Sequence, residues 1–169
     1  VVTWSACDFG SYQELSSLPP IAAIMSEMQC TKIRVPTDYT NPQGQALEIG
    51  VSGVKATPSA FKPELFFFNP GGPGGDGYAL PAIFASIWAV DSQDDAVSAS
   101  QKQQLRQRFD VIGFSPRGLG SSTQLSCPSA QMLEPEDQSL SGRYPANLAA
   151  EQRNVEAMTR DCASNALKP

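Results

Sequence analysis

Apolar and polar residues alternate in two stretches of the first third of the chain. Residues 31–35 alternate at period two and stop at Pro36, and residues 46–54 alternate again. Such alternation is typical of strands with one buried face. Residues 38–44, which lie between the two stretches, are rich in turn-forming residues. The pattern predicts a β-hairpin with a long connection.

A second pattern follows, in which short apolar runs flank longer segments with helical spacing. Residues 65–68 are continuously apolar, which predicts a strand buried on both faces, as in a parallel sheet. Residues 80–90 and 97–108 are compatible with helices and are separated by a polar break, and residues 109–114 form the next apolar run. The order strand, helix, strand predicts a parallel crossover.

The two ends of the chain have their own expected elements. Residues 1–30 form an irregular or partly helical lead-in, in which two prolines open a short helix at residues 21–28. The region after Ser115 is rich in loops until Asn147, which we expect to cap a last helix. Four residues mark one side of that helix: Leu148, Val155, Met158 and Cys162. With only two parallel strands, the sheet is expected to be incomplete by itself.

Composition excludes several classes of protein. The chain has 169 residues, 41% of them hydrophobic and 17% charged, which is enough for one domain with a substantial core. The net charge of -5, with no run of Lys or Arg, argues against a nucleic-acid partner. No segment is long and apolar enough for a membrane helix, so we expect no membrane partner.

The four cysteines point to an oxidising compartment. Cys7 with Cys30, and Cys127 with Cys162, form two well-separated couples without a C-x-x-C motif. The chain has no histidine, so a zinc site has little support and we expect neither metal nor cofactor. Local pairing would staple the lead-in and a later loop, although four cysteines allow three connectivities and four buried thiols are an alternative. We expect a secreted, extracellular or periplasmic protein.

The glycine-rich segment 70–75 (Pro-Gly-Gly-Pro-Gly-Gly), directly behind the apolar run, is the best candidate for chemistry. As an oxyanion loop it would offer backbone N–H groups to a developing negative charge. As a G-x-G-x-x-G motif over residues 72–77 it would bind a dinucleotide, with Asp94 and Asp95 near the ribose, but Pro73 removes an N–H from that turn. A tight turn without chemistry is the third interpretation.

Ser115 resembles a nucleophile because residues 113–117 (Gly-Phe-Ser-Pro-Arg) come close to G-x-S-x-G after a strand. The residue after a nucleophilic serine must supply an N–H to the oxyanion, and Pro116 has none. We therefore interpret Ser115 as a hydroxyl that caps a loop. Arg117 is expected to hold the same loop through hydrogen bonds or an ion pair, with a solvated surface arginine as the alternative.

Three blocks of sequence, in order and at matching spacing, resemble one family. Residues 30–39 (CTKIRVPTDY), 69–75 (NPGGPGG) and 109–122 (FDVIGFSPRGLGSS) are similar to the proline iminopeptidase and tripeptidyl aminopeptidase branch of secreted serine α/β-hydrolases. The resemblance extends from Trp4 to Cys162. It implies an α/β fold, namely the N-terminal part of an α/β-hydrolase fold with its opening hairpin and parallel β-α-β unit.

The resemblance also implies roles for residues of the glycine-rich segment. Gly72 matches the position whose backbone N–H faces the oxyanion, with Gly71 beside it, and the bond from Gly72 to Pro73 is expected to be cis. The implied division of the chain is a disulfide-stapled lead-in (1–30), the front half of the hydrolase core (31–126), and a loop and helix closed by a second disulfide (127–169).

Two departures from the family shape the functional expectation. The family commonly has Asp where Ser115 stands, and its catalytic serine, acid and histidine all follow the last residue here. We therefore expect the N-terminal part of a serine hydrolase that cleaves at peptide N-termini, with the triad on a second polypeptide, such as the rest of a nicked precursor. An esterase of the same fold and a non-catalytic binding or regulatory remnant are the alternatives.

Overall fold

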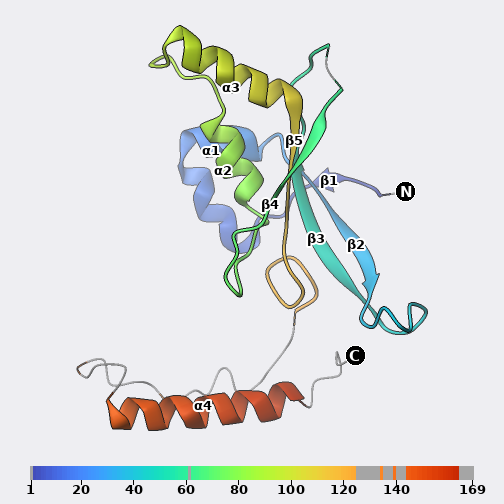
Figure 1. Ribbon diagram of the computed structural model, residues 1–169, viewed down its shortest axis with the longest axis vertical. Helices are drawn as coiled ribbons and strands as arrows, with labels where there is room; N and C mark the ends of the chain where they lie inside the picture. Colours follow the sequence, from blue (N-terminus) through green and yellow to red (C-terminus); the bar gives the residue numbers. More distant parts are fainter. Residues whose placement is uncertain (1, 61, 125–133, 135–138, 140–143, 164–169) are drawn as a thin grey trace. The chain divides into compact units, whose positions relative to one another are not determined.

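The computed structural model describes residues 2–60, 62–124, 134, 139 and 144–163 (Figure 1). The chain forms two compact units. The first consists of Val1–Val35 and Leu47–Gln124, and the second of Pro36–Ala46 and Leu125–Pro169. Each unit is described by itself.

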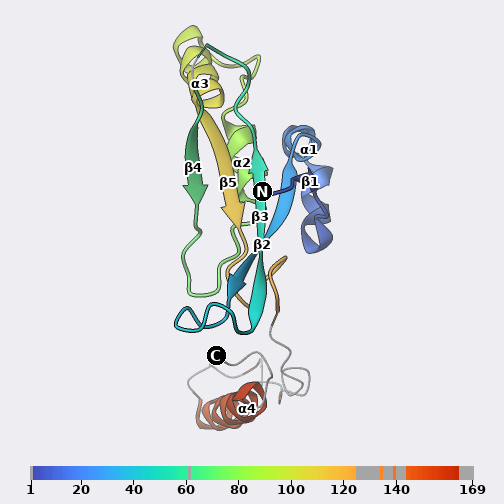
Figure 2. The same cartoon turned by 90° about the vertical axis from the view of Figure 1, so that its right-hand side faces the viewer.

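A mixed sheet of five strands is the framework of the first unit, and β4 lies at one of its sides (Figure 2). The order is β1-β2-β3-β5-β4; β1 is antiparallel to β2, β3 is antiparallel to β5, and β4 is parallel to β5. The strands are β1 (Ser5–Ala6), β2 (Gln29–Pro36), β3 (Ala46–Val54), β4 (Glu64–Phe68) and β5 (Phe109–Phe114). A sheet of this kind with helices fits the expected α/β class.

The predicted hairpin is present as β2 and β3, which are hydrogen-bonded neighbours. β3 has the predicted bounds, and β2 begins two residues before the predicted strand. The Thr37 N–H and hydroxyl both donate to the Gln45 carbonyl, at 2.8 and 2.7 Å. These bonds close the connection at the point where the two strands separate.

Three helices and a 3-10 helix belong to the first unit, and α1 and α2 lie on the same face of the sheet (Figures 1 and 2). They are η1 (Gly10–Ser17), α1 (Pro19–Met25), α2 (Leu80–Ile87) and α3 (Ala96–Arg108). α1 begins at Pro19, where the fixed φ of proline suits a first turn. The core beneath these helices is formed by Ile24, Met25, Met28, Val54, Ala82 and Ala85. The predicted order strand, helices, parallel strand is confirmed by β4, α2, α3 and β5.

β4 corrects one expectation, because it is exposed rather than buried on both faces. Leu65 and Phe67 each keep 60% of their surface exposed. The physical reason is position: β4 is the last strand of the described sheet and pairs only with β5. On its other face Phe68 stacks on Phe84 of α2, with ring centroids 3.9 Å apart. The apolar run at residues 65–68 therefore predicted the strand correctly, but it did not predict which elements cover its two faces.

The second unit contains α4 (Pro145–Ala163), which begins before the predicted cap. Asn147 is the third residue of the helix and is 3% exposed, so its expected role as the capping residue is wrong. Pro145 takes the first position instead, where its missing N–H costs nothing. Arg153 of α4 pairs with Glu134, N to O 2.7 Å. None of the helices among the described residues is long and apolar enough to cross a membrane.

A disulfide joins Cys7 to Cys30, with the two Cα atoms 4.9 Å apart. It connects the segment after β1 to β2 and confirms local pairing for the first cysteine couple. Cys127 lies outside the described residues, so its pairing with Cys162 stays a prediction.

We predict that the double substitution Cys7→Ser and Cys30→Ser lowers the free energy of unfolding by about 2–4 kcal/mol. The bond closes a loop with a sequence separation of 23 residues, and its loss gives the unfolded chain more conformations. Denaturant unfolding of the protein that contains this chain measures the change. An unchanged midpoint and slope would contradict a stabilising role for this disulfide.

Candidate active site

The glycine loop, residues 70–75, follows β4 and has a backbone that few residues other than glycine adopt. Gly71, Gly72 and Gly74 have φ values of 78°, 135° and 92°. A Cβ on Gly72 would lie 2.7 Å from the Gly74 nitrogen. The bond from Gly72 to Pro73 is cis, as the family resemblance leads one to expect. The loop is thus a specific turn in which Gly72 has no room for a side chain.

The N–H groups of the glycine loop differ in what they contact. The Gly71 N–H donates to the Asn69 side-chain oxygen at 3.1 Å, and the Gly75 N–H donates to the Gly71 carbonyl at 3.2 Å. The N–H groups of Gly72 and Gly74 have no hydrogen-bond acceptor among the described residues, and both glycines are exposed. Of the two predicted oxyanion donors, Gly72 therefore presents an unused N–H, whereas that of Gly71 is occupied within the loop.

The chain just after the glycine loop is bonded to two strands of the sheet. The Gly77 N–H donates to the Phe114 carbonyl of β5 at 3.1 Å. The hydroxyl of Ser52, fully buried on β3, donates to the Tyr78 carbonyl. Both contacts lie at the carboxyl end of β5. In α/β sheets, binding and active sites commonly lie at the carboxyl ends of the strands.

Ser115 acts as a loop-capping hydroxyl in the post-β5 loop, residues 115–124, as its sequence context predicts. Its side chain is fully buried and donates to Asp76 Oδ1 at 2.9 Å and Oδ2 at 3.1 Å. Its oxygen accepts the Ser121 N–H at 3.1 Å. A hydroxyl with these contacts has no exposed face from which to attack a substrate.

The post-β5 loop is closed by hydrogen bonds that sequence reasoning missed. The buried Ser122 hydroxyl donates to the Ser115 carbonyl at 2.6 Å and accepts the Gly50 N–H at 2.9 Å. The Gly118 N–H donates to the Thr123 carbonyl at 3.1 Å. Arg117 is exposed in this loop, and its holding role stays a prediction. Serines are common in loops, so no local signal marked Ser122.

Asp76 is a second residue that the sequence did not reveal. Its Oδ1 accepts the Tyr78 N–H at 2.9 Å, and its carboxylate also bonds the Ser115 hydroxyl. Burial, followed by the influence of the neighbouring Asp76 carboxylate, raises the pKa of Tyr12 well above the usual tyrosine range. The sequence could have indicated the local bond, because Asp often accepts the N–H of the residue two positions later. Nothing near Asp76 in the sequence indicated its bond to the distant Ser115.

An open hollow of about 540 Å³ lies beside this network. Its lining includes polar side chains from four parts of the first unit: Asp8, Tyr12, Lys32, Tyr78 and Ser121. Burial raises the pKa of Tyr78, which keeps its hydroxyl protonated. Among the described residues no group of three or more His, Cys, Asp or Glu could hold a metal ion. The described site offers hydrogen bonds rather than metal ligands.

Several curated proteins of known name are similar to this chain. It is 32% identical over 108 residues to the tripeptidyl aminopeptidase of Streptomyces coelicolor, covering 62% of this chain and 17% of the relative. It is 35% identical over 95 residues to carboxylesterase B of Mycobacterium tuberculosis (56% and 16%). It is 30% identical over 122 residues to serine protease Hip1 of the same species (72% and 19%). The chain spans less than a fifth of the length of these relatives.

These similarities support an α/β-hydrolase-like family and, in general terms, a serine hydrolase. No protein-family model matches the chain. The names of the relatives include both peptidases and an esterase, two activities that share nucleophilic attack on a carbonyl carbon.

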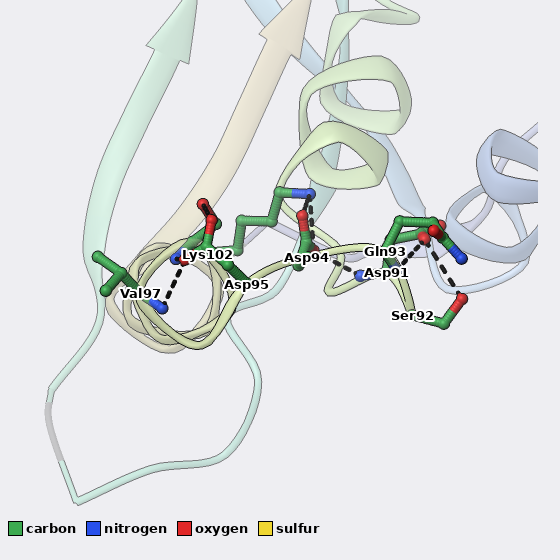
Figure 3. Close-up of polar contacts among 8 residues, drawn as sticks. Asp91, Ser92, Gln93, Asp94, Asp95, Val97 and Lys102 are labelled. Atoms are coloured by element: carbon green, nitrogen blue, oxygen red, sulfur yellow. Dashed lines mark hydrogen bonds and ion pairs between the residues drawn. The ribbon is translucent and has the colours of Figure 1, made fainter.

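Asp94 and Asp95, which the dinucleotide interpretation placed near a ribose, form hydrogen bonds at the start of α3 instead (Figure 3). Both oxygens of Asp94 accept from Lys102 Nζ, at 2.8 and 2.9 Å, and the Asp91 N–H bonds to it at 2.7 Å. Asp95 is the N-cap of α3 and accepts the N–H groups of Val97 and Ser98 at 2.8 and 3.0 Å. Both carboxylates have a structural role at this helix end.

We predict that Asp95→Ala lowers the melting temperature at pH 7 and that the difference from wild type shrinks in acid. The Ser98 N–H, then the Ser98 hydroxyl and the Val97 N–H, lower the pKa of Asp95. A lowered folded-state pKa gives stability that is fully present above about pH 4 and is lost as the pH falls through the folded pKa.

Thermal melts of both forms from pH 7 down to about pH 3 measure this difference. Asp95→Asn is the control, since it keeps a capping oxygen without a titratable group, and its difference from Asp95→Ala should not depend on pH. A pH-independent loss in Asp95→Ala would refute the assignment.

Proposed function

We propose that this chain supplies the oxyanion loop of a serine hydrolase that cleaves peptide or amide bonds at substrate N-termini. The observation that carries the proposal is the exposed N–H of Gly72, which has no acceptor among the described residues and sits in a constrained turn at the end of β4. Such preorganised donors stabilise charge that develops in a transition state. Similarity to proteins named aminopeptidase and serine protease supports the same conclusion.

In the proposed reaction a serine hydroxyl outside this chain attacks the carbonyl carbon of the substrate. A histidine accepts the serine proton, and the carbonyl oxygen becomes an oxyanion that receives a hydrogen bond from Gly72. When the tetrahedral intermediate collapses, the histidine returns the proton to the leaving amine. Because the chain has no histidine, the serine, acid and histidine come from the remaining polypeptide in this proposal.

Ester hydrolysis is the second candidate activity, and one observation favours it. Carboxylesterase B of Mycobacterium tuberculosis has the highest identity, 35%, of the three relatives described above. An oxyanion loop serves an ester and an amide equally, because the same tetrahedral oxyanion forms. The choice between them is made by the leaving group and by loops outside this chain.

The partner in this proposal is the polypeptide that carries the triad, joined to this chain or derived from the same precursor. Exposed Leu65 and Phe67 on the outermost strand β4 support it, because a bare apolar edge invites pairing with another strand. We also propose a secreted or otherwise extracellular location, which the disulfide between Cys7 and Cys30 supports.

We predict that removing the Gly72 N–H lowers turnover of the assembled hydrolase by about 10² to 10³-fold. Gly72→Pro deletes this donor but also conflicts with the φ of 135°. A backbone ester at the Gly71–Gly72 bond, introduced by semisynthesis, deletes the N–H while keeping the glycine. Steady-state kinetics with aminoacyl and acyl-ester substrates measure the loss.

A backbone ester at the Pro73–Gly74 bond is the matched control, because it deletes the Gly74 N–H, which also has no acceptor among the described residues, and keeps the glycine. This variant should keep turnover within a few-fold of wild type. Full activity of the Gly72 ester would overturn the oxyanion assignment.

We predict that a fluorophosphonate probe labels the assembled protein outside residues 1–169. The nucleophilic serine lies on the other part in this proposal, and the buried Ser115 cannot react. Peptide mapping after labelling locates the adduct, and native mass spectrometry tests whether this chain of 18.1 kDa occurs joined to the rest. A labelled serine within this chain, or an active species of 18 kDa alone, would contradict the proposal.

A further inference from the structure

Asp76 connects two segments that are distant in sequence. Its carboxylate accepts the Tyr78 N–H next to the glycine loop and the Ser115 hydroxyl from the post-β5 loop. Asp76 lies four positions after Gly72 along the chain, and the Gly77 N–H bonded to β5 follows it directly.

These contacts require a carboxylate rather than any polar side chain. The Ser115 hydroxyl and the Tyr78 N–H both donate, and a carboxylate has two acceptor oxygens with about four lone-pair sites between them. Ser115 donates its one hydroxyl proton to Asp76 and accepts the Ser121 N–H, so it is both donor and acceptor in this network. An amide side chain would offer one oxygen and would place an NH₂ group against these donors.

We propose that Asp76 is a positioning residue that fixes the glycine loop against the post-β5 loop and thereby holds the Gly72 N–H at a constant place. The assignment rests on the proposed oxyanion function of Gly72 for its catalytic meaning. The link itself rests only on the contacts of the carboxylate with the Ser115 hydroxyl and the Tyr78 N–H. Hydrogen bonds to an ionised acceptor are about twice as strong as neutral ones, which suits a link between two loops.

The first test is the kinetics of the full-length hydrolase with Asp76→Ala, Asp76→Asn or Ser115→Ala. Asp76→Ala should lower kcat about 10²-fold with KM unchanged, because displacing a group by about 1 Å at a reacting centre costs that much. Asp76→Asn, which keeps one acceptor oxygen, should lose roughly 10-fold. An effect on KM alone, or wild-type kcat in Asp76→Ala, would refute the positioning role.

A double-mutant cycle tests whether Asp76 acts through Ser115. If the two side chains form one link, the double substitution Asp76→Ala with Ser115→Ala should lower kcat no further than Asp76→Ala alone. Independent structural damage would multiply the two losses instead, and that outcome would overturn the proposal. Should Asp76→Ala fail to fold, the pair Asp76→Asn and Ser115→Ala gives the same cycle.

Hydrogen exchange of the full-length protein provides a readout that does not need activity. Amides of residues 69–78 and 115–122 should exchange faster in Asp76→Ala, while those of α3 are unchanged. The control is Asp91→Ala, which removes a carboxylate that accepts the Gln93 N–H at 2.8 Å in a similar turn of the α2–α3 connection. Asp91→Ala should leave both the glycine-loop exchange and kcat at wild-type values.

The two proposals fail in different ways. Faster exchange in Asp76→Ala together with a fully active Gly72 ester would keep the link between the loops but remove its catalytic purpose. Unchanged exchange together with an inactive Gly72 ester would keep the oxyanion donor and refute Asp76 as the residue that positions it.

Discussion

The site depends on one constraint: the backbone of the segment after the glycine loop lies very close to the backbone of β5 at the carboxyl end of that strand. A Cβ on Gly113 would overlap the Gly77 carbonyl and lie 2.6 Å from the Pro81 ring. The absence of a side chain there lets the Gly77 N–H reach the Phe114 carbonyl, so that the segment after the glycine loop lies directly on the sheet. α2 then begins at Leu80, close to the end of β5. Any larger residue at 113 would displace the loop and the helix together.

Buried hydroxyls extend this contact into a continuous network. Ser52 donates to the chain beside the glycine loop, Ser115 donates to Asp76, and Ser122 connects the Ser115 carbonyl to the Gly50 N–H. Buried polar groups are tolerated when they have partners, and a network of satisfied groups also specifies one arrangement. Where the family resemblance leads one to expect an acid at position 115, a serine is present and the carboxylate comes from Asp76.

Local patterns in the sequence predicted most of the main strands and helices but not their surroundings. Alternation gave β3 with its observed bounds, because a strand with one buried face has a period of two. The exposure of Leu65 depends on which strands flank β4, and no local pattern contains that information. The bond between Asp76 and Ser115 joins residues 39 positions apart, so composition of either segment alone could not reveal it. Asn147 was misread as a cap because Pro145 is an equally good helix start.

The orientation of β4 connects the two features that the proposed function uses. β4 and β5 are parallel, so the glycine loop and the post-β5 loop emerge at the same edge of the sheet. A further strand that paired with the free side of β4 in the same direction would place its own carboxyl-end loop beside Gly72. Ligands of parallel sheets bind at this edge, where the loops of neighbouring strands converge. In the proposed hydrolase, pairing the outer edge of β4 and bringing a nucleophile to the oxyanion donor are therefore one structural event.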